Sequence, residues 1–186
     1  MTIASAGQPR GAIEEALDGV YETFALATDE ETLLGVFGDC FEEWRHIHVG
    51  PVIQGAVWEV RPPRKPRIAM LDGYATFDFG DWHAHVCIGE HKGATPELAV
   101  IRRTGKAELY RMLTDGTPSS WGFRCFNGAG EQQATILLPH PYLTDKQQVT
   151  REPDWDRLQL WDGLRLKYLG LGPDPLDRSL TGFRHG

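Results

Sequence analysis

The sequence predicts an α+β domain built on a mainly antiparallel sheet. Between residues 55 and 139, short β-type runs alternate with Gly, Pro and Asp, and links such as residues 104–106 and 128–131 are too short for a helical crossover. On both sides of this region, apolar residues recur at helical spacing. We therefore expect N-terminal helices and a C-terminal helix packed on the sheet, with a barrel-like curved sheet as one alternative.

Two helices are predicted in the N-terminal quarter. The first is indicated by apolar residues three or four positions apart, which share one helical stripe: Ile13, Ala16, Leu17, Val20, Tyr21 and Phe24. The second begins at Thr28, which forms a capping-box pattern with Glu31. Its apolar face continues through Leu33, Phe37, Cys40, Phe41 and Trp44.

The central region is expected to supply the strands. The runs span residues 56–60, 67–71, 74–79, 82–88, 98–103, 107–112, 121–127 and 134–138. Because several of the links are short, neighbouring strands should pair as antiparallel hairpins.

The segment 154–169 fits two structures. Asp154 is a suitable helix N-cap and Gly170 a suitable stop, whereas leucines alternating around Asp162-Gly163 would form a hairpin. We favour the helix because its start and stop signals agree. Residues 173–186 are expected to be a tail, so that a single domain spans residues 1–172.

Composition and charge exclude several classes of protein. The 19 Lys and Arg against 26 Asp and Glu give a formal net charge of −7, which disfavours binding to a phosphate backbone. No apolar run approaches the roughly 18 residues of a membrane helix, and the N-terminus has no signal-peptide pattern. Cys40, Cys87 and Cys125 are far apart in the sequence. We expect a cytoplasmic protein with reduced cysteines that binds neither nucleic acid nor membrane.

The densest set of chemically active side chains lies in residues 81–91. In a strand, His83, His85 and Cys87 would share one face, because side chains alternate with a period of two. Alternate residues are about 6.7 Å apart, so the two imidazoles could hold one ion between them. We predict His83 and His85 as metal ligands, with Cys87 as the next candidate.

A third ligand must come from another element. The pattern His83-x-His85-x4-Glu90 resembles the first metal motif of the cupin family, and His140 would correspond to the later histidine of that family's second motif. The resemblance implies a metal site on a β-scaffold with His140 among its ligands. Glu90 and Asp81, where they are not ligands, are the candidate catalytic residues, as a general base or as groups that orient an imidazole.

A second His-x-His pair occurs at His46-Ile47-His48. Both imidazoles would again share one side of an extended segment, and together with the first pair they could complete a metal sphere. For this second pair we favour a structural role. Among the basic residues, Arg124 is the candidate for binding an anionic substrate.

The strand His83-Ala84-His85-Val86-Cys87 also resembles the signature of the histidine-triad nucleotide hydrolases and transferases, with Cys87 in place of the third histidine. The resemblance implies that His85 would be the nucleophile that attacks an α-phosphate.

These observations favour a mononuclear metal-dependent enzyme that uses Zn or Fe(II). Hydrolase, lyase and non-haem iron oxygenase chemistry are all open, on a small polar or anionic substrate. The main alternative is a non-enzymatic protein that binds a metal or haem and acts as a sensor. A scaffold domain with structural histidines is the third reading. A second copy of the chain, as a homodimer, is the candidate protein partner.

Overall fold

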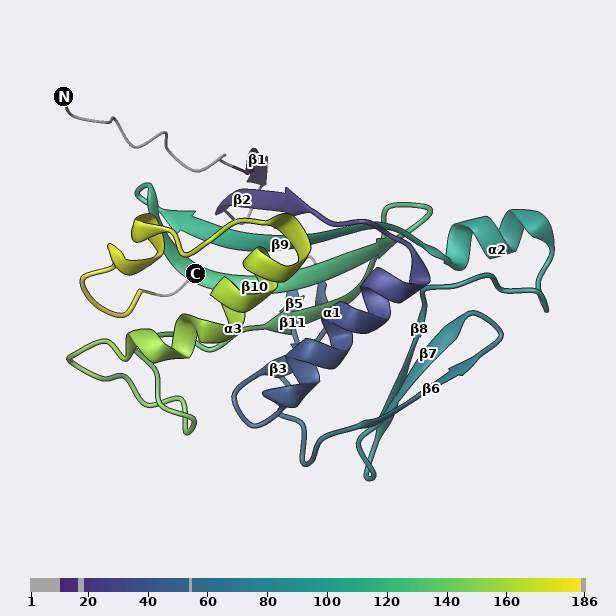
Figure 1. The fold of residues 1–186 in the computed structure, drawn as a ribbon, viewed down its shortest axis with the longest axis horizontal. Helices are drawn as coiled ribbons and strands as arrows, with labels where there is room; N and C mark the ends of the chain where they lie inside the picture. The colour runs from purple at the N-terminus through teal and green to yellow at the C-terminus, as the bar shows by residue number, and fades with distance from the viewer. Residues whose placement is uncertain (1–10, 17–18, 54, 185–186) are drawn as a thin grey trace.

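The computed structural model describes residues 11–16, 19–53 and 55–184, and its fold is α+β with antiparallel sheets, as predicted (Figure 1). Within the described residues, the largest sheet has the strand order β1-β2-β9-β10-β11-β3 and does not close into a barrel. Its strands are β1 (Ala12–Ala16), β2 (Gly19–Ala25), β9 (Thr104–Thr114), β10 (Thr117–Asn127), β11 (Gln132–Leu137) and β3 (His48–Gly50).

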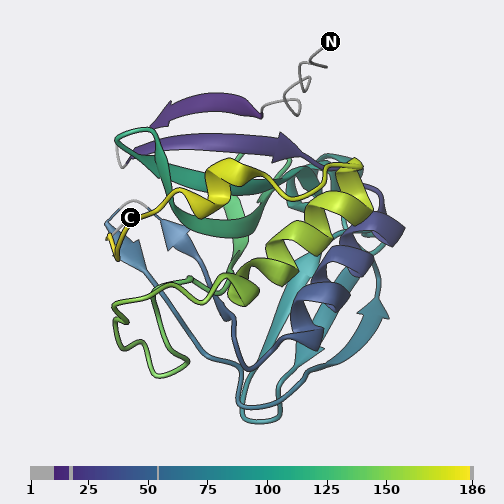
Figure 2. The same cartoon turned by 60° about the vertical axis from the view of Figure 1, so that its left-hand side comes forward.

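A smaller sheet and a short hairpin complete the β-structure. The smaller sheet consists of β6 (Arg67–Leu71), β7 (Tyr74–Asp78) and β8 (His83–Cys87), and the hairpin of β4 (Val52–Ile53) and β5 (Ala56–Val57). The helices are α1 (Glu30–Glu42), α2 (Pro96–Arg102) and α3 (Gln159–Leu169), with 3-10 turns η1 (Trp155–Leu158) and η2 (Pro175–Arg178). Figure 2 shows α1 and α3 side by side, and both pack on the same face of the large sheet.

The core forms where α1 packs between the two larger sheets. The ring of Phe37 lies 4.6 Å from that of Phe77 on β7 and 5.1 Å from that of Phe123 on β10. The predicted second helix is therefore confirmed, although its N-cap is Asp29 and not Thr28. The Asp29 carboxylate accepts a hydrogen bond from the Thr32 backbone N–H at 2.9 Å.

The predicted first helix is wrong, because the described part of that segment forms the β1–β2 hairpin. Residues 21–24 are all buried, so apolar side chains occur on both faces of β2. When a strand has apolar residues on both faces, some of them are three or four positions apart in the sequence, which is also the spacing of one helical stripe. Leu17, part of the predicted stripe, lies outside the described residues.

The predicted strand at residues 98–103 is also wrong, since α2 occupies this position. The Thr95 hydroxyl accepts a hydrogen bond from the Leu98 backbone N–H, and Pro96 stands in the first turn. Val100 is 70% exposed, so the apolar run is not buried as a strand would bury it. Residues 104–106, predicted as a link, are the start of β9.

The other predicted strands are present, but the run 56–60 forms only the two-residue β5, and β9 and β10 begin three and four residues before their predicted starts. β6 spans residues 67–71 as predicted, and β7, β8, β10 and β11 overlap their predicted runs. The structure confirms the predicted C-terminal helix and not the alternative hairpin. Asp154 caps η1, which leads into α3, and Gly170 ends α3 with a φ of 68°.

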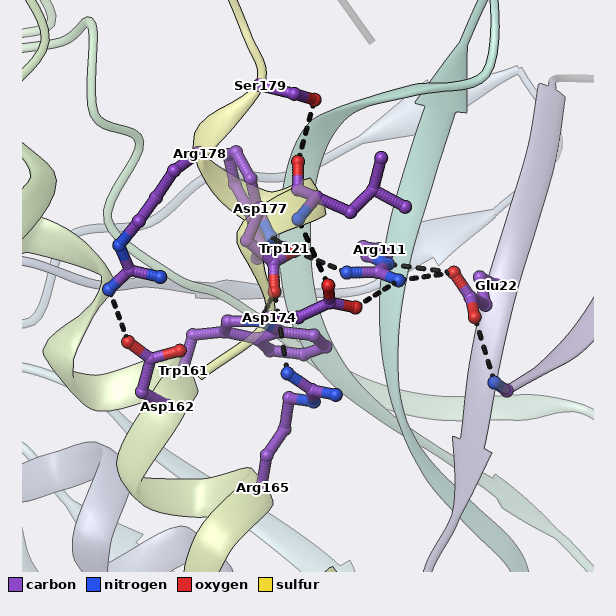
Figure 3. Close-up of polar contacts among 12 residues, drawn as sticks. Glu22, Arg111, Trp121, Trp161, Asp162, Arg165, Asp174, Asp177, Arg178 and Ser179 are labelled. Atoms are coloured by element: carbon purple, nitrogen blue, oxygen red, sulfur yellow. Dashed lines mark hydrogen bonds and ion pairs between the residues drawn. The ribbon is translucent and has the colours of Figure 1, made fainter. Parts of the chain in front are cut away.

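Residues 173–186, expected to be a tail, include a buried turn that binds to the sheet (Figure 3). Asp177 in η2 is fully buried. One of its carboxylate oxygens accepts hydrogen bonds from Arg111 and from the Trp121 indole, each at 2.8 Å. The other accepts from the Trp161 indole at 2.8 Å and lies 3.5 Å from Arg165.

Replacing this carboxylate should destabilise the fold strongly. Asp177→Asn leaves the buried guanidinium of Arg165 without a carboxylate partner among the described residues and removes one of the three carboxylates that contact Arg111. We expect a loss of about 3–5 kcal/mol in the free energy of unfolding. Urea denaturation of the variant measures it. Asp115→Asn, at an aspartate whose side chain is 86% exposed, is the matched control and should change stability by less than about 0.5 kcal/mol. Equal stability of the two variants would contradict this expectation.

Candidate functional site

The face of the large sheet that points away from α1 forms one wall of a cleft of about 460 Å³. Phe123 faces α1, and side chains alternate along a strand, so its neighbour in β10, Gly122, belongs to the opposite face. In register with Gly122 are Tyr110 on β9 and Leu137 on β11, and Leu137 is in turn paired with His48 on β3. Tyr110, Leu137 and His48 all line the cleft.

The β4–β5 hairpin and the end of the chain supply other parts of the cleft wall. Val52 and Val57 line it from the hairpin, and Phe183 and Arg184 from the C-terminal segment. A second cavity of about 410 Å³ shares Val52 and Val57 with the cleft, as well as the tyrosines described next. The two cavities therefore adjoin under the hairpin.

A pair of tyrosines forms the floor where the cavities meet. The rings of Tyr21 and Tyr110 lie 5.7 Å apart, edge to face. A Cβ at Gly122 would lie 2.5 Å from the Tyr110 ring, so this position leaves room only for glycine. The Arg124 guanidinium lies 4.7 Å from the centre of the Tyr21 ring and lines the second cavity. Arg124, predicted to bind substrate, is thus near the cleft.

Arg124 is held in place by carboxylates. Its Nε lies 2.7 Å from Glu108, and its Nη2 lies 3.0 Å from Glu14. These ion pairs fix the guanidinium plane above the tyrosine rings. The aromatic floor of the cleft is therefore a fixed surface.

His46 lines the cleft just before β3, and one of its nitrogens is held by an acidic residue. Nδ1 of His46 lies 2.9 Å from the Asp145 carboxylate, which also accepts a hydrogen bond from Arg157 at 2.9 Å. Partial burial works against ionisation of Asp145, but the hydrogen bonds from His46 and Arg157 outweigh it and lower the pKa of the carboxyl.

His48 lines the same cleft from β3. Its Nε2 lies 3.5 Å from Nη2 of Arg61 and 3.5 Å from the Gln147 side-chain nitrogen. Burial, followed by the charge of Arg61, lowers the pKa of His48. The imidazole is therefore neutral at physiological pH.

His140, a predicted metal ligand, is 9% exposed and lines the cleft from the loop after β11. Its Nδ1 accepts a hydrogen bond from the Tyr142 backbone N–H at 3.0 Å, and its ring lies 5.2 Å from that of Phe183. Its Nε2 is buried. Burial lowers the pKa of His140 to about 4, although a hydrogen bond with the Ser119 backbone acts in the opposite direction.

The other predicted site residues lie on or beside the smaller sheet. The rings of His83 and His85 are 4.9 Å apart on an exposed face of β8, as the alternation predicts, and Nδ1 of His85 lies 2.8 Å from the Thr76 hydroxyl. Asp81 and Glu90 are exposed at either end of β8. Neither cavity described above includes any of these residues in its lining.

The cysteines are free and buried, and Cys87 does not join the exposed imidazoles. Cys87 is 2% exposed, and burial raises the pKa of its thiol. Burial also raises the pKa of Cys125 to about 12. Both cysteines are therefore protonated at physiological pH.

Sequence reasoning gave His46 and His48 a structural role, whereas both line the cleft. The signal that could have found them is the His-x-His pattern itself, which occurs twice in the chain. Asp145 and Arg157 carried no such signal, because Asp145 is 99 residues from the histidine that it holds.

Comparison with known proteins gives a family and a fold. The model of a family of unknown function, DUF7676, matches residues 11–170. No curated protein matches the chain. A solved structure described as the crystal structure of ChuX is 12% identical, with a TM-score of 0.50 over 76% of this chain and 74% of that one. A structure of "the Heme Binding Protein ChuX" is 15% identical, with a TM-score of 0.49 and the same coverage.

The prediction of a metalloenzyme with Zn or Fe(II) is wrong. Among the described residues, no three His, Cys, Asp or Glu side chains come close enough to hold a metal ion. The cause is topological, because His83 and His85 are on the smaller sheet while His140 lies beside the large one. Within the described residues, no helix has the length and apolar character needed to cross a membrane.

The buried imidazole of His140 should make stability depend on pH. Its pKa falls from 6.5 to about 4 on folding, so between these values the unfolded chain binds more protons. We expect the free energy of unfolding to decrease as the pH falls through this window, by a contribution on the order of 3 kcal/mol. Urea denaturation at several pH values measures it.

His140→Asn is the informative variant for this test. The asparagine side chain can accept the Tyr142 N–H hydrogen bond but does not titrate. The variant should therefore lose much of the pH dependence between about pH 4 and 6.5. If wild type and variant show the same slope of stability against pH, His140 is not the group responsible.

Proposed function

We propose that this chain, which belongs to the DUF7676 family of unknown function, is a non-enzymatic haem-binding protein whose ligand occupies the cleft on the open face of the large sheet. The observation that carries the proposal is the cleft itself, in which His46, His48 and His140 face an aromatic and aliphatic surface. Its volume of about 460 Å³ is within the range of pockets that bind small molecules and cofactors.

The lining fits the flat, largely apolar body of a porphyrin. Tyr21, Tyr110 and Met112 come from the sheet, and Val52 and Val57 from the hairpin. Val57 is 57% exposed although it is apolar, which is expected for a side chain that contacts a ligand. Bound haem would cover this surface.

The polar groups of the cleft fit the iron and the two carboxylates of haem. Imidazoles are common iron ligands in haem proteins, and three histidines line the cleft: His46, His48 and His140. Arg157 and Arg184 line the cleft as cations. Each guanidinium has five N–H donors and makes one ion pair with an aspartate, so donors remain for a propionate.

ChuX supports the same proposal at the level of the fold. The structure with a TM-score of 0.50 indicates that the chain shares the ChuX fold, and ChuX is named a haem-binding protein. Haem supplies an iron centre that can change oxidation state or bind a further ligand. The residues of this chain would hold that group, orient it and shield it from water.

We propose further that the protein works in the cytoplasm. Three free, buried cysteines agree with a reducing compartment.

The proposed haem-binding function requires a small molecule as the partner, and the net charge of −7 argues against nucleic acid. A homodimer stays a proposal that sedimentation analysis can test.

Titration of the purified protein with haemin tests the proposed function. We expect a saturable change in the Soret band with one haem per chain. Val57→Glu places a carboxylate in the cleft at an exposed position that the core does not need, and affinity should fall at least about tenfold, which corresponds to about 1.4 kcal/mol. Val100→Glu on α2, also at an exposed valine, is the matched control and should bind as wild type does. The proposal fails if wild type shows no saturable change, or if the two variants bind equally.

A further inference from the structure

We infer that His46 is the residue that ligates the haem iron, through Nε2, and that Asp145 is its positioning residue. This inference rests on the proposed function and adds to it the identity of the ligand. The cleft offers three histidines, and the hydrogen bonds of each ring decide which nitrogen has a lone pair for iron. These contacts distinguish the three rings.

The contact with Asp145 leaves Nε2 of His46 as the metal-binding nitrogen. An ionised carboxylate only accepts hydrogen bonds, so the 2.9 Å contact requires the proton on Nδ1. In the neutral ring the lone pair is then on Nε2, for which the described residues provide no hydrogen-bond donor. A histidine that gives one nitrogen to a carboxylate and the other to a metal is a recurrent arrangement in metalloproteins.

Asp145 is itself fixed in position. Nη1 of Arg157 donates to the same carboxylate oxygen at 2.9 Å, and Nε of Arg157 donates to the His140 backbone carbonyl at 3.0 Å. One guanidinium thus ties η1 to two points of the loop between β11 and η1. The Asp145 carboxylate, which orients His46, is therefore held by contacts within the protein and not by a ligand.

His140 has the opposite tautomer. Its Nδ1 accepts the Tyr142 N–H, so in the neutral ring the proton is on Nε2. To bind iron through Nε2, His140 would have to break this hydrogen bond or lose a second proton.

His48 has a lone pair at Nε2, but its neighbour is unfavourable to a metal. The guanidinium of Arg61 lies 3.5 Å from that nitrogen, so an iron ion there would face a fixed positive charge. The ring of His46 instead contacts a carboxylate, that of Asp145, which also accepts a hydrogen bond from Arg157. The direct contact of each ring therefore favours iron at His46 over His48.

The carboxylate should affect the bound iron as well as the ring. A hydrogen bond from Nδ1–H to an anion makes the imidazole more basic and stabilises ferric over ferrous iron. Loss of the charge at Asp145 should therefore raise the reduction potential. A role for Asp145 that was only structural would not change this quantity.

The test compares His46→Ala, His48→Ala, His85→Ala and Asp145→Asn, each loaded with haemin. In His46→Ala we expect loss of the histidine-ligated absorption and EPR spectrum, and recovery of that spectrum when free imidazole is added. The matched control is His85→Ala, at a histidine that lines neither cavity, and it should keep the wild-type spectrum. The side chain of His46 is 37% exposed, so its truncation is compatible with folding, which circular dichroism checks.

Asp145→Asn is the conservative variant, because its amide oxygen can still accept from Nδ1 of His46. We expect the wild-type coordination spectrum, a haem affinity lower by about 10-fold, and a positive shift of the reduction potential measured by spectroelectrochemistry. An unchanged potential would show that Asp145 does not act on the iron.

The outcomes separate this inference from the proposed function. If wild type does not bind haemin, the proposed function fails. If wild type binds with a histidine-ligated spectrum that persists in His46→Ala and is lost in His48→Ala or His140→Asn, haem binding stands and the assignment of His46 is overturned.

Discussion

The arrangement of the cleft depends on one buried carboxylate. Asp177 receives hydrogen bonds from Arg111 and from the indoles of Trp121 and Trp161, which come from two strands of the sheet and from α3. Such a network contributes less to net stability than to choosing a single arrangement, because each charge is costly unless every partner is in place. Phe183 and Arg184, six and seven residues further on, line the cleft. The core contact thus fixes the segment that closes one side of the site.

The large sheet separates stability from function by its two faces. One face meets α1 through Phe123, and the other presents Tyr110 and His48 to the cleft. Because successive side chains point to opposite faces of the sheet, neighbouring residues of one strand serve the two roles. Arg124, held by two carboxylates above the tyrosine rings, keeps the open face ordered. A preformed apolar surface of this kind loses little conformational entropy when it binds a rigid, flat ligand.

Local patterns in the sequence predict those elements whose signals are local. β6 and the end of α3 at Gly170 follow from turn and cap residues. β2 could not be recognised, because burial on both faces gave it helical spacing. The role of Asp177 depends on Arg111, 66 residues earlier in the chain. The same limit applies to His46, whose partner Asp145 is 99 residues away. The prediction that His83 and His85 share one face of a strand is correct, but a shared face alone does not make a functional site.

The most direct test of the account is where a porphyrin binds. Gallium protoporphyrin IX is diamagnetic and matches haem in shape and charge, so it can be added to isotopically labelled protein while backbone amide shifts are recorded by NMR. We expect the largest shifts at His46, His48, Val57 and residues 137–143, with His83 and His85 unchanged. Shifts centred on β8, or none at residues 46–48, would contradict the assignment of the cleft as the haem site.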